Sequence, residues 1–381
     1  MPHIFRNPLG GFVYLLILFL TASIGSVLIM APLMPLMVLY PAFYRKIMDN
    51  LMGLWLTLPV GLIELMFDVK FYITGDKIKI NESCLIMMNH RTTIDWLFFW
   101  EVFWQQSSVK REKIILKKSL KAVPGFGWAM QVAMYIFLAR KWDVDQPWIK
   151  MMLDYFSILK YKAQILIFPE GTDLNPKSKS RSDSYAKKNG LQYYEYVLHP
   201  RTTGFVYVAQ TMRKSGIIDA IYDVTVGYPC QIPTFGELDS LCGNFPDEVH
   251  FHIQRHPIST IPISDEGVEK WCQEKWREKE AVLEKFYTQD KVFHDDRQNG
   301  STNNIKPKHT GLSKGVLWSV MCFWVVFAFY APLLLWYSSV ARYQVLIFGV
   351  LFQVLTFMGG TELLSYSALN WRYGNKSKLV L

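Results

Sequence analysis

A histidine and an aspartate five residues apart, His90 and Asp95, have the residue types and spacing of a catalytic pair. They follow an apolar run, Cys84 to Met88, which is typical of a buried strand that ends at a polar turn. Thr92 or Thr93 can cap a following helix, which places Asp95 in its first turn while His90 stays on the loop. We therefore expect the two side chains to touch.

Such a pair can act as a general base. The Asp95 carboxylate can accept the hydrogen of the imidazole Nδ1 of His90, which fixes the tautomer and leaves Nε2 to take a proton. This is a catalytic triad without its serine, and a substrate hydroxyl that takes the place of the serine would attack an activated acyl group directly. A histidine that only caps the helix is the alternative, because this spacing alone arises by chance in many chains.

A second polar turn, Glu170-Gly171-Thr172, also follows a strand pattern, Gln164 to Phe168. Ligands gather at the carboxyl ends of the strands in an open α/β sheet, so both turns are expected to face one crevice. Gly171 lets the backbone approach a ligand closely. Glu170 can accept a hydrogen bond from a substrate hydroxyl or hold Arg140 in place, and Thr172 can donate to a phosphate or cap the next segment of the chain.

Together, the His-x4-Asp and Glu-Gly-Thr motifs resemble those of the glycerolipid acyltransferases of the lysophosphatidic acid acyltransferase superfamily. The segments VPGFGWAMQVAMYIFLARKW, SKSRSDSYAKKNG and YEYVLHPRTTGF are similar to its lysocardiolipin and lysophosphatidylinositol acyltransferase branch. The resemblance covers roughly residues 85 to 287. Asp173 stands where many members carry an arginine, and the stretch from Leu198 to Arg201 replaces the usual fourth block. Both departures argue against phosphatidic acid synthesis as the main reaction.

The resemblance implies an enzyme that transfers the acyl group of acyl-CoA, a co-substrate, to an anionic lysophospholipid, without a bound cofactor or metal. Lysocardiolipin or lysophosphatidylinositol is the expected acceptor, and lysophosphatidic acid comes next. A CoA-independent phospholipid-lysophospholipid transacylase is the other alternative. The resemblance also makes Arg140, after the apolar run Met134 to Leu138, a ligand of the lipid phosphate, whereas an exposed arginine beside Lys141 is the plain interpretation.

Basic residues gather in two further runs. One follows the Glu-Gly-Thr turn and can receive phosphates of coenzyme A or of the lipid: Lys177, Lys179, Arg181, Lys187 and Lys188. Lys179, Arg181 and the later Arg201 are the substrate-binding candidates among these basic residues. The other run is a docking surface for anionic lipid or a plain solvated face: Lys110, Arg111, Lys113, Lys117, Lys118 and Lys121.

The composition indicates a membrane protein with a soluble domain. Of 381 residues, 51% are hydrophobic and 15% aromatic, and the formal net charge is +9. Without nucleic-acid-binding motifs, this charge fits lipid and nucleotide phosphates better than nucleic acid. The five cysteines are dispersed and form no C-x-x-C pair, and His250 and His252 have no acidic or cysteine partner at ligand spacing, so we expect no metal site.

The elements that position the site form a predicted α/β domain over residues 71–288, a mostly parallel sheet flanked by helices. After Cys84–Met88, the predicted strands are Lys113–Leu116, Met134–Leu138, Gln164–Phe168, Ala220–Val226 and Val249–Ile253. The predicted helices include Trp148–Tyr161, Thr202–Lys214 and Glu266–Phe286.

An amino-terminal membrane anchor is predicted over residues 1–70. Phe12 to Met30 is long enough to cross a bilayer core of about 30 Å. The helix should bend or end at the next prolines, Pro32, Pro35 and Pro41. Leu51 to Phe67 is short for a span, so we expect an interfacial or re-entrant helix there.

Beyond the catalytic domain, residues 289–314 are polar and aperiodic and are predicted to be a linker. Two uncharged stretches predict a transmembrane hairpin over residues 315–362, followed by a basic cytosolic tail, 363–381. The excess of lysine and arginine beside the spans favours a cytosolic catalytic domain and a lumenal amino end. We therefore expect an integral membrane protein of the endoplasmic reticulum.

Overall fold

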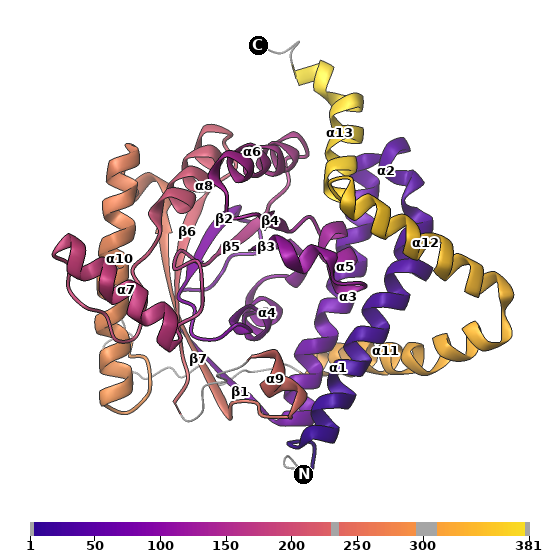
Figure 1. The fold of residues 1–381 in the computed structure, drawn as a ribbon, viewed down its shortest axis with the longest axis horizontal. Helices are drawn as coiled ribbons and strands as arrows, with labels where there is room; N and C mark the ends of the chain where they lie inside the picture. Colours follow the sequence, from indigo (N-terminus) through magenta and orange to yellow (C-terminus); the bar gives the residue numbers. More distant parts are fainter. Residues whose placement is uncertain (1–3, 230–235, 295–310, 378–381) are drawn as a thin grey trace. The chain divides into compact units, whose positions relative to one another are not determined.

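A computed structural model describes residues 4–229, 236–294 and 311–377 (Figure 1). The chain forms two compact units that interleave along the sequence. The first contains Met1–Phe12, Leu62–Ser108 and Gln164–Thr310, and the second contains Val13–Gly61, Val109–Ala163 and Gly311–Leu381. The predicted domains are consecutive segments instead, and their boundaries stay predictions. Most of the predicted linker, residues 289–314, lies outside the described residues.

Five strands form the sheet of the first unit, in the order β1-β7-β6-β2-β5 (Figure 1). Every neighbouring pair is parallel except β6 and β7. The strands are β1 (Lys70–Gly75), β2 (Cys84–Met88), β5 (Gln164–Ile167), β6 (Ala220–Gly227) and β7 (Glu248–Pro257). This confirms the prediction of a mostly parallel sheet, and β1 is the strand that the sequence pattern did not indicate.

The strands at the centre of this sheet are buried throughout. Every residue of β2 and β6 is buried, which explains their apolar composition. The exception in composition is Asp223 of β6, whose carboxylate is paired with the buried Lys279. This ion pair ties β6 to the long helix that carries Lys279.

The helices of the first unit are α4 (Asp95–Gln106), α7 (Pro176–Asn189), α8 (Thr202–Lys214), α9 (Glu237–Leu241) and α10 (Asp265–Thr288), with a 3-10 turn at Ile258–Thr260. The bounds of α7 follow from its caps. Asn175 and Ser178 form a capping box, Pro176 begins the helix, and Gly190 ends it in a left-handed conformation (φ 62°). α8 has the predicted bounds, and α10 extends the predicted helix by a few residues.

The second unit begins with the amino-terminal helices. α1 (Pro8–Gly25) continues as a π-helical turn, Ser26–Met30, and a 3-10 turn, Ala31–Leu33, and is followed by α2 (Pro35–Leu39) and α3 (Pro41–Phe67). Proline lacks a backbone N–H and is tolerated in the first turn of a helix. Pro32, Pro35 and Pro41 each lie at the start of a new segment, which confirms the predicted breaks.

Between these helices and the carboxyl end lie two parallel strands, β3 (Glu112–Lys117) and β4 (Ile136–Leu138). The helical elements around them are two 3-10 turns, η3 (Val109–Arg111) and η4 (Lys118–Ala122), and two helices, α5 (Phe126–Val132) and α6 (Trp142–Ile158). α6 begins six residues before the predicted start, because the Asp145 carboxylate accepts hydrogen bonds from the main chain of Ala139 and Lys141 (2.7 and 3.0 Å).

Three helices complete the second unit: α11 (Gly311–Tyr337), α12 (Ser339–Phe357) and α13 (Thr361–Ser377). The first two confirm the predicted pair of apolar helices. α13 occupies most of the predicted tail, residues 363–381, and buries Leu369 completely. The described part of this tail is therefore a packed helix.

Four helical stretches among the described residues are long and apolar enough to cross a membrane: Pro8–Leu33, Pro41–Phe67, Gly315–Tyr337 and Ser339–Phe357. The second is longer than the sequence pattern indicated, because the helix begins at Pro41, ten residues before Leu51, and is not interrupted at Pro59. With 27 residues, its length alone does not favour an interfacial placement.

The amino end is part of the first unit. The Arg6 guanidinium donates to the Phe67 carbonyl group (2.9 and 2.7 Å) and pairs with Asp247 (2.8 Å). Arg6 therefore lies beside the end of α3 and the residue that precedes β7. The expected arrangement, a lumenal amino end with a cytosolic domain, stays a prediction.

Candidate active site

Three neighbouring strands of the first unit, β6, β2 and β5, end at the same edge of the sheet because they are parallel. The residues that come after these strands are Tyr228, His90 and Glu170. Such an edge gathers side chains from distant parts of the chain. The candidate site lies at this edge.

His90 and Asp95 make the predicted hydrogen bond, with 2.9 Å between Nδ1 and Oδ2. The same carboxylate accepts hydrogen bonds from the main-chain N–H of Arg91 (2.6 Å) and Thr92 (3.0 Å) and from the Tyr228 hydroxyl. An Asp95 carboxylate that accepts from these three donors has no hydrogen to donate to the imidazole. It therefore accepts from the imidazole as well, and Nδ1 carries the hydrogen. Nε2 is then the nitrogen that can take a proton.

Exposure differs sharply within this pair. The Asp95 side chain is completely buried, whereas 14% of the His90 side chain is exposed. The imidazole stacks on Phe168, which follows β5, with 4.2 Å between the ring centres. The histidine is thus fixed from two sides and reachable from solvent, as a general base must be.

Glu170 joins the two motifs through the main chain. One carboxylate oxygen accepts from the N–H of His90 (3.2 Å) and the other from the N–H of Leu198 (3.1 Å). Burial raises the pKa of Glu170 to about 8, although both of these hydrogen bonds favour the ionised form. Glu170 therefore braces the His90 loop, a role that sequence reasoning missed, and its contact with substrate stays a prediction.

Gly171 and Arg201 lie side by side. Gly171 has φ 72°, a left-handed conformation that favours glycine, and a Cβ built there would lie 3.5 Å from the Arg201 Cδ. The main-chain N–H of Arg201 donates to the Pro169 carbonyl group (2.8 Å). Both residues are exposed. The segment before α8 thus presents an arginine beside the turn after β5.

Thr172 donates to the carboxylate of Asp173 (3.2 Å), which also accepts from the Asn175 amide (3.0 Å). Burial alone would raise the pKa of Asp173, but hydrogen bonds, chiefly from Asn175, and the nearby His90 hold it below its usual value. Asp173 therefore places a negative charge near the dyad. The role of Thr172 toward a phosphate stays a prediction.

Family models match two parts of the chain, one described as "Acyltransferase" over residues 70–229 and one as "Acyltransferase C-terminus" over residues 239–324. Lysocardiolipin acyltransferase 1 of Gallus gallus is 45% identical and aligns over 93% of each chain. The protein of that name from Danio rerio is 50% identical over 73% of this chain and 71% of its own.

A more distant relative is lysophosphatidylinositol acyltransferase 10 of Caenorhabditis elegans, 38% identical over 77% of this chain and 75% of its own. A solved structure, the 1-acyl-sn-glycerophosphate acyltransferase PlsC of Thermotoga maritima, is 14% identical with a TM-score of 0.43 and covers 72% of this chain and 97% of that one. This chain belongs to the acyltransferase family.

The other residues predicted to bind substrate differ in their exposure, in their ion pairs and in the unit to which they belong. Lys179 of α7 pairs with Asp183 (2.9 Å) and lies 3.5 Å from the carboxylate of Glu195, so its charge is already balanced, whereas Arg181 is exposed. Arg140 belongs to the second unit, where it follows β4 in a left-handed conformation (φ 63°). Its contact with a phosphate stays a prediction.

The second basic run, from Lys110 to Lys121, does not lie entirely on the surface. Lys113 is 1% exposed and pairs with Asp49 (3.1 Å), and Lys121 is 6% exposed and pairs with Glu362 (3.1 Å). Neither lysine is available to bilayer lipid or water, so for these two both predicted interpretations are wrong. Both charges are buried with a carboxylate, which is how long cationic side chains are accommodated inside proteins.

Sequence reasoning missed Tyr228 and assigned no individual role to Asn89 and Arg91, the two polar residues beside His90. Asn89 exchanges two hydrogen bonds with the main chain of Val226 (3.1 and 2.8 Å), which fixes the loop to β6. Arg91 donates to the Tyr196 carbonyl group (3.0 Å) and lies over the Tyr287 ring. Among the described residues, no three His, Cys, Asp or Glu side chains are grouped to hold a metal ion.

Proposed function

We propose that this protein transfers the acyl group of an acyl-CoA to a hydroxyl of an anionic lysophospholipid, lysocardiolipin or lysophosphatidylinositol. The observation that carries the proposal is the His90–Asp95 hydrogen bond at the edge where three strands end. The names of the similar proteins support the acceptor, since they include lysocardiolipin and lysophosphatidylinositol acyltransferases.

The reaction follows from the tautomer of His90. Nε2 takes the proton of the acceptor hydroxyl as its oxygen attacks the thioester carbonyl, and Asp95 stabilises the resulting imidazolium. The tetrahedral intermediate collapses with loss of the coenzyme A thiolate, which leaves readily because an alkyl thiol is far more acidic than an alcohol; a cysteine thiol, for comparison, has a pKa of about 8.5. The imidazolium then returns a proton to this thiolate, which restores the enzyme and completes the ester.

Basic side chains supply the contacts for anionic groups. Arg201 is exposed beside Gly171, which supports its role as a phosphate ligand, because a guanidinium can bind a phosphate through two parallel hydrogen bonds. Arg181 and Arg140 are further phosphate ligands in this proposal. Lys179 contributes less, because it must first release Asp183.

The same proposal places the enzyme in the endoplasmic reticulum membrane with its catalytic sheet in the cytosol, where acyl-CoA is found. Four helices of sufficient length and hydropathy support membrane insertion. The excess of basic residues beside the helices supports the cytosolic side.

The test is a transfer assay with microsomes that contain the full chain, labelled oleoyl-CoA and a panel of lysophospholipids. We expect lysocardiolipin or lysophosphatidylinositol to be the best acceptor and lysophosphatidic acid to be slower. A second arm replaces oleoyl-CoA with labelled phosphatidylcholine. Transfer in that arm alone would identify a CoA-independent transacylase and refute the proposal.

The variant His90→Ala should lose about 10³-fold in rate, because general-base assistance is removed. His294 offers a matched control, since it forms a histidine–aspartate pair with Asp290 (2.8 Å) on the surface. His294→Ala should keep full activity. Equal rates for His90→Ala and the parent protein would overturn the mechanism.

A further inference from the structure

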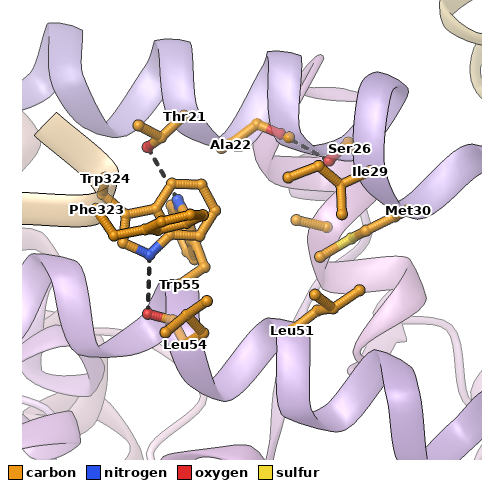
Figure 2. A pocket seen from close by; sticks show the side chains of 12 residues that line it. Thr21, Ala22, Ser26, Ile29, Met30, Leu51, Leu54, Trp55, Phe323 and Trp324 are labelled. Carbon is orange, nitrogen blue, oxygen red and sulfur yellow. Dashed lines mark hydrogen bonds between the residues drawn. The ribbon is translucent and has the colours of Figure 1, made fainter. Parts of the chain in front are cut away.

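A pocket with a volume of about 140 Å³ lies within the second unit, between α1, α3, α5 and α11 (Figure 2). Its walls are mostly aliphatic and aromatic: Ile29, Met30, Leu51, Leu54, Trp55 and Phe323. None of the candidate active-site residues lines it. The pocket therefore needs an explanation of its own.

Small residues and a widened helical turn create the room. Ala22, Gly25 and Ala129 line the pocket where larger side chains would fill it. The π-helical turn Ser26–Met30 lies along one side, and two of its carbonyl groups accept weak hydrogen bonds from the Gln344 amide (3.4 and 3.3 Å). The wider turn is thus supported by α12.

The polar atoms in the walls are already satisfied (Figure 2). The Thr21 hydroxyl donates to the Ile17 carbonyl group (2.7 Å) and accepts from the Trp55 indole (3.0 Å). Ser26 and Trp324 each donate to a main-chain carbonyl group (2.7 and 3.0 Å). A buried water needs two to four polar partners, so this pocket favours an apolar occupant.

The pocket lies near the middle of the three long helices that enclose it. Ala22, Leu54 and Trp324 are each within about two residues, or ~3 Å along the axis, of the midpoint of their stretch. These stretches are Pro8–Leu33, Pro41–Phe67 and Gly315–Tyr337. Whichever of them crosses the bilayer, the pocket is at the depth of the hydrocarbon core, where acyl chains end.

We propose that this pocket binds the methyl end of an acyl chain from a phospholipid of the surrounding bilayer. An apolar cavity of about 150 Å³ takes up benzene, so this one accommodates roughly six carbon atoms. The proposal rests on the membrane insertion proposed above. A bilayer lipid is the source because its chain ends are present at this depth in every state of the enzyme.

Photo-crosslinking of the full chain in lipid nanodiscs tests the proposal. The probe is phosphatidylcholine with a diazirine near the methyl end of one acyl chain, and adducts are mapped by mass spectrometry. We expect adducts on Trp55 and Trp324, which are only 6% and 4% exposed and reachable by lipid through the pocket. Phe329 of α11, 75% exposed, is the internal control for contact with bulk lipid.

Two variants fill the pocket from different helices. Gly25→Leu and Ala129→Leu should each reduce the Trp55 adduct at least about tenfold while the Phe329 adduct is unchanged. Gly25→Ala is the matched control, because its added Cβ would meet only the Trp324 ring at 3.8 Å, an ordinary contact. It should change labelling less than twofold. The second filling variant keeps the test valid if one of them fails to fold.

Adducts confined to exposed residues such as Phe329 would overturn the proposal, and so would a Trp55 adduct that survives both filling variants. Trp55 labelling by a diazirine-bearing acyl-CoA but not by the phospholipid would assign the pocket to the acyl donor and also overturn it. His90→Ala protein should be labelled like the parent. Failure of the proposed reaction is thereby distinguished from failure of this inference.

Discussion

Asp95 has four hydrogen-bond donors, and the Tyr228 hydroxyl is the one that comes from another strand. Burial and the neighbouring Asp95 carboxylate raise the pKa of Tyr228 far above its usual value, so this hydroxyl stays a donor at every working pH. The hydroxyl acts on the imidazole through Asp95, to which it donates. Tyr228 is therefore a positioning residue for the dyad.

We predict that Tyr228→Phe lowers kcat about tenfold with little change in the KM for acyl-CoA. A buried acceptor that loses one donor costs about 1–3 kcal/mol, and ~1.4 kcal/mol corresponds to a tenfold rate. Tyr222→Phe is the matched control, because its hydroxyl donates to Glu82 (2.7 Å) away from the dyad. Steady-state kinetics of both variants decide the point. An equal loss of kcat in Tyr222→Phe would attribute the effect to stability instead.

A second prediction concerns the pH dependence that Glu170 confers. Its pKa is raised to about 8 by burial, so the folded state holds a proton that the unfolded state releases near pH 4.5. This contribution to stability is complete below about pH 4.5 and is lost as the pH rises toward about 8. In Glu170→Gln, which cannot titrate, that loss is absent.

Thermal unfolding in nanodiscs between pH 5.5 and 8.5 measures this effect. The stability of the parent protein relative to Glu170→Gln should fall with rising pH by on the order of 1 kcal/mol per unit. Glu170→Gln should also lose activity. The NH2 group of the glutamine would face one of the two main-chain N–H groups that donate to the carboxylate in the parent protein, and two donors cannot form a hydrogen bond. Parallel stability curves for the two proteins would mean that Glu170 is ionised throughout this range.

At the residue scale, local spacing predicted the His90–Asp95 hydrogen bond because one strand-to-helix turn brings the two together. Tyr228 gave no such signal, since 133 residues separate it from Asp95 and only the order of the strands places it there. Glu170 was visible as a motif, but its contacts with main-chain N–H groups leave no trace in a side-chain pattern.

At the scale of elements, a buried ion pair fastens the carboxyl-terminal helices to the rest of the second unit. Lys121 of η4 pairs with Glu362 at the start of α13 (3.1 Å) and donates to the Gly359 carbonyl group (2.7 Å). The Gln131 amide of α5 donates to the carbonyl group of Lys121 (3.1 Å) and to the Thr356 hydroxyl (2.9 Å). The start of α13 is thus fixed by contacts with η4 and α5.

We predict that Lys121→Met destabilises the protein by about 3–5 kcal/mol, because it leaves the Glu362 carboxylate buried without a counter-ion. The double variant Lys121→Met/Glu362→Met should regain most of this loss. Lys150→Met breaks an exposed pair with Asp154 (2.7 Å) and should cost about 0.5 kcal/mol or less. Thermal unfolding of the three variants in nanodiscs provides the comparison, and a double variant no more stable than Lys121→Met would disprove the pairing.

Elements with a strong apolar or amphipathic pattern were predicted from the sequence, whereas α13, which has neither, was not. β2, β6 and the apolar pair α11 and α12 are examples of the first kind. α13 is of the second kind, because its polar residues read as a tail and only its packing within the second unit buries Leu369. Contacts between distant segments determine whether such an element forms. A short stretch of neighbouring residues in the sequence does not contain those contacts.

At the scale of the whole molecule, the sequence does not reveal that the two compact units interleave, because that division depends on contacts across the entire chain. It also favours a lumenal amino end, which the contacts of Arg6 with Phe67 argue against. Arg45 is one of the basic residues that follow the first predicted span, yet it is 2% exposed and pairs with Asp49 (2.9 Å) within α3. A buried, paired arginine is a poor marker of the cytosolic side.

The contacts of Arg6 give the final prediction. Since its guanidinium donates to the Phe67 carbonyl group at the end of α3, the start of α1 and the end of α3 must lie on the same side of the membrane. This holds whether the two helices cross as a hairpin or dip in and return. We therefore predict that the amino end is cytosolic, together with the catalytic sheet.

Glycosylation mapping in microsomes tests this prediction. The sequon at Asn81, before β2, and a sequon in an added amino-terminal extension should both stay bare, because lumenal transferases never meet them. A sequon-bearing insertion at Ser338, between α11 and α12, is the positive control, since a crossing hairpin places that turn in the lumen. If the amino-terminal sequon is modified while Asn81 stays bare, the contact between Arg6 and Phe67 does not form in the membrane, and α1 crosses the bilayer without the return of α3.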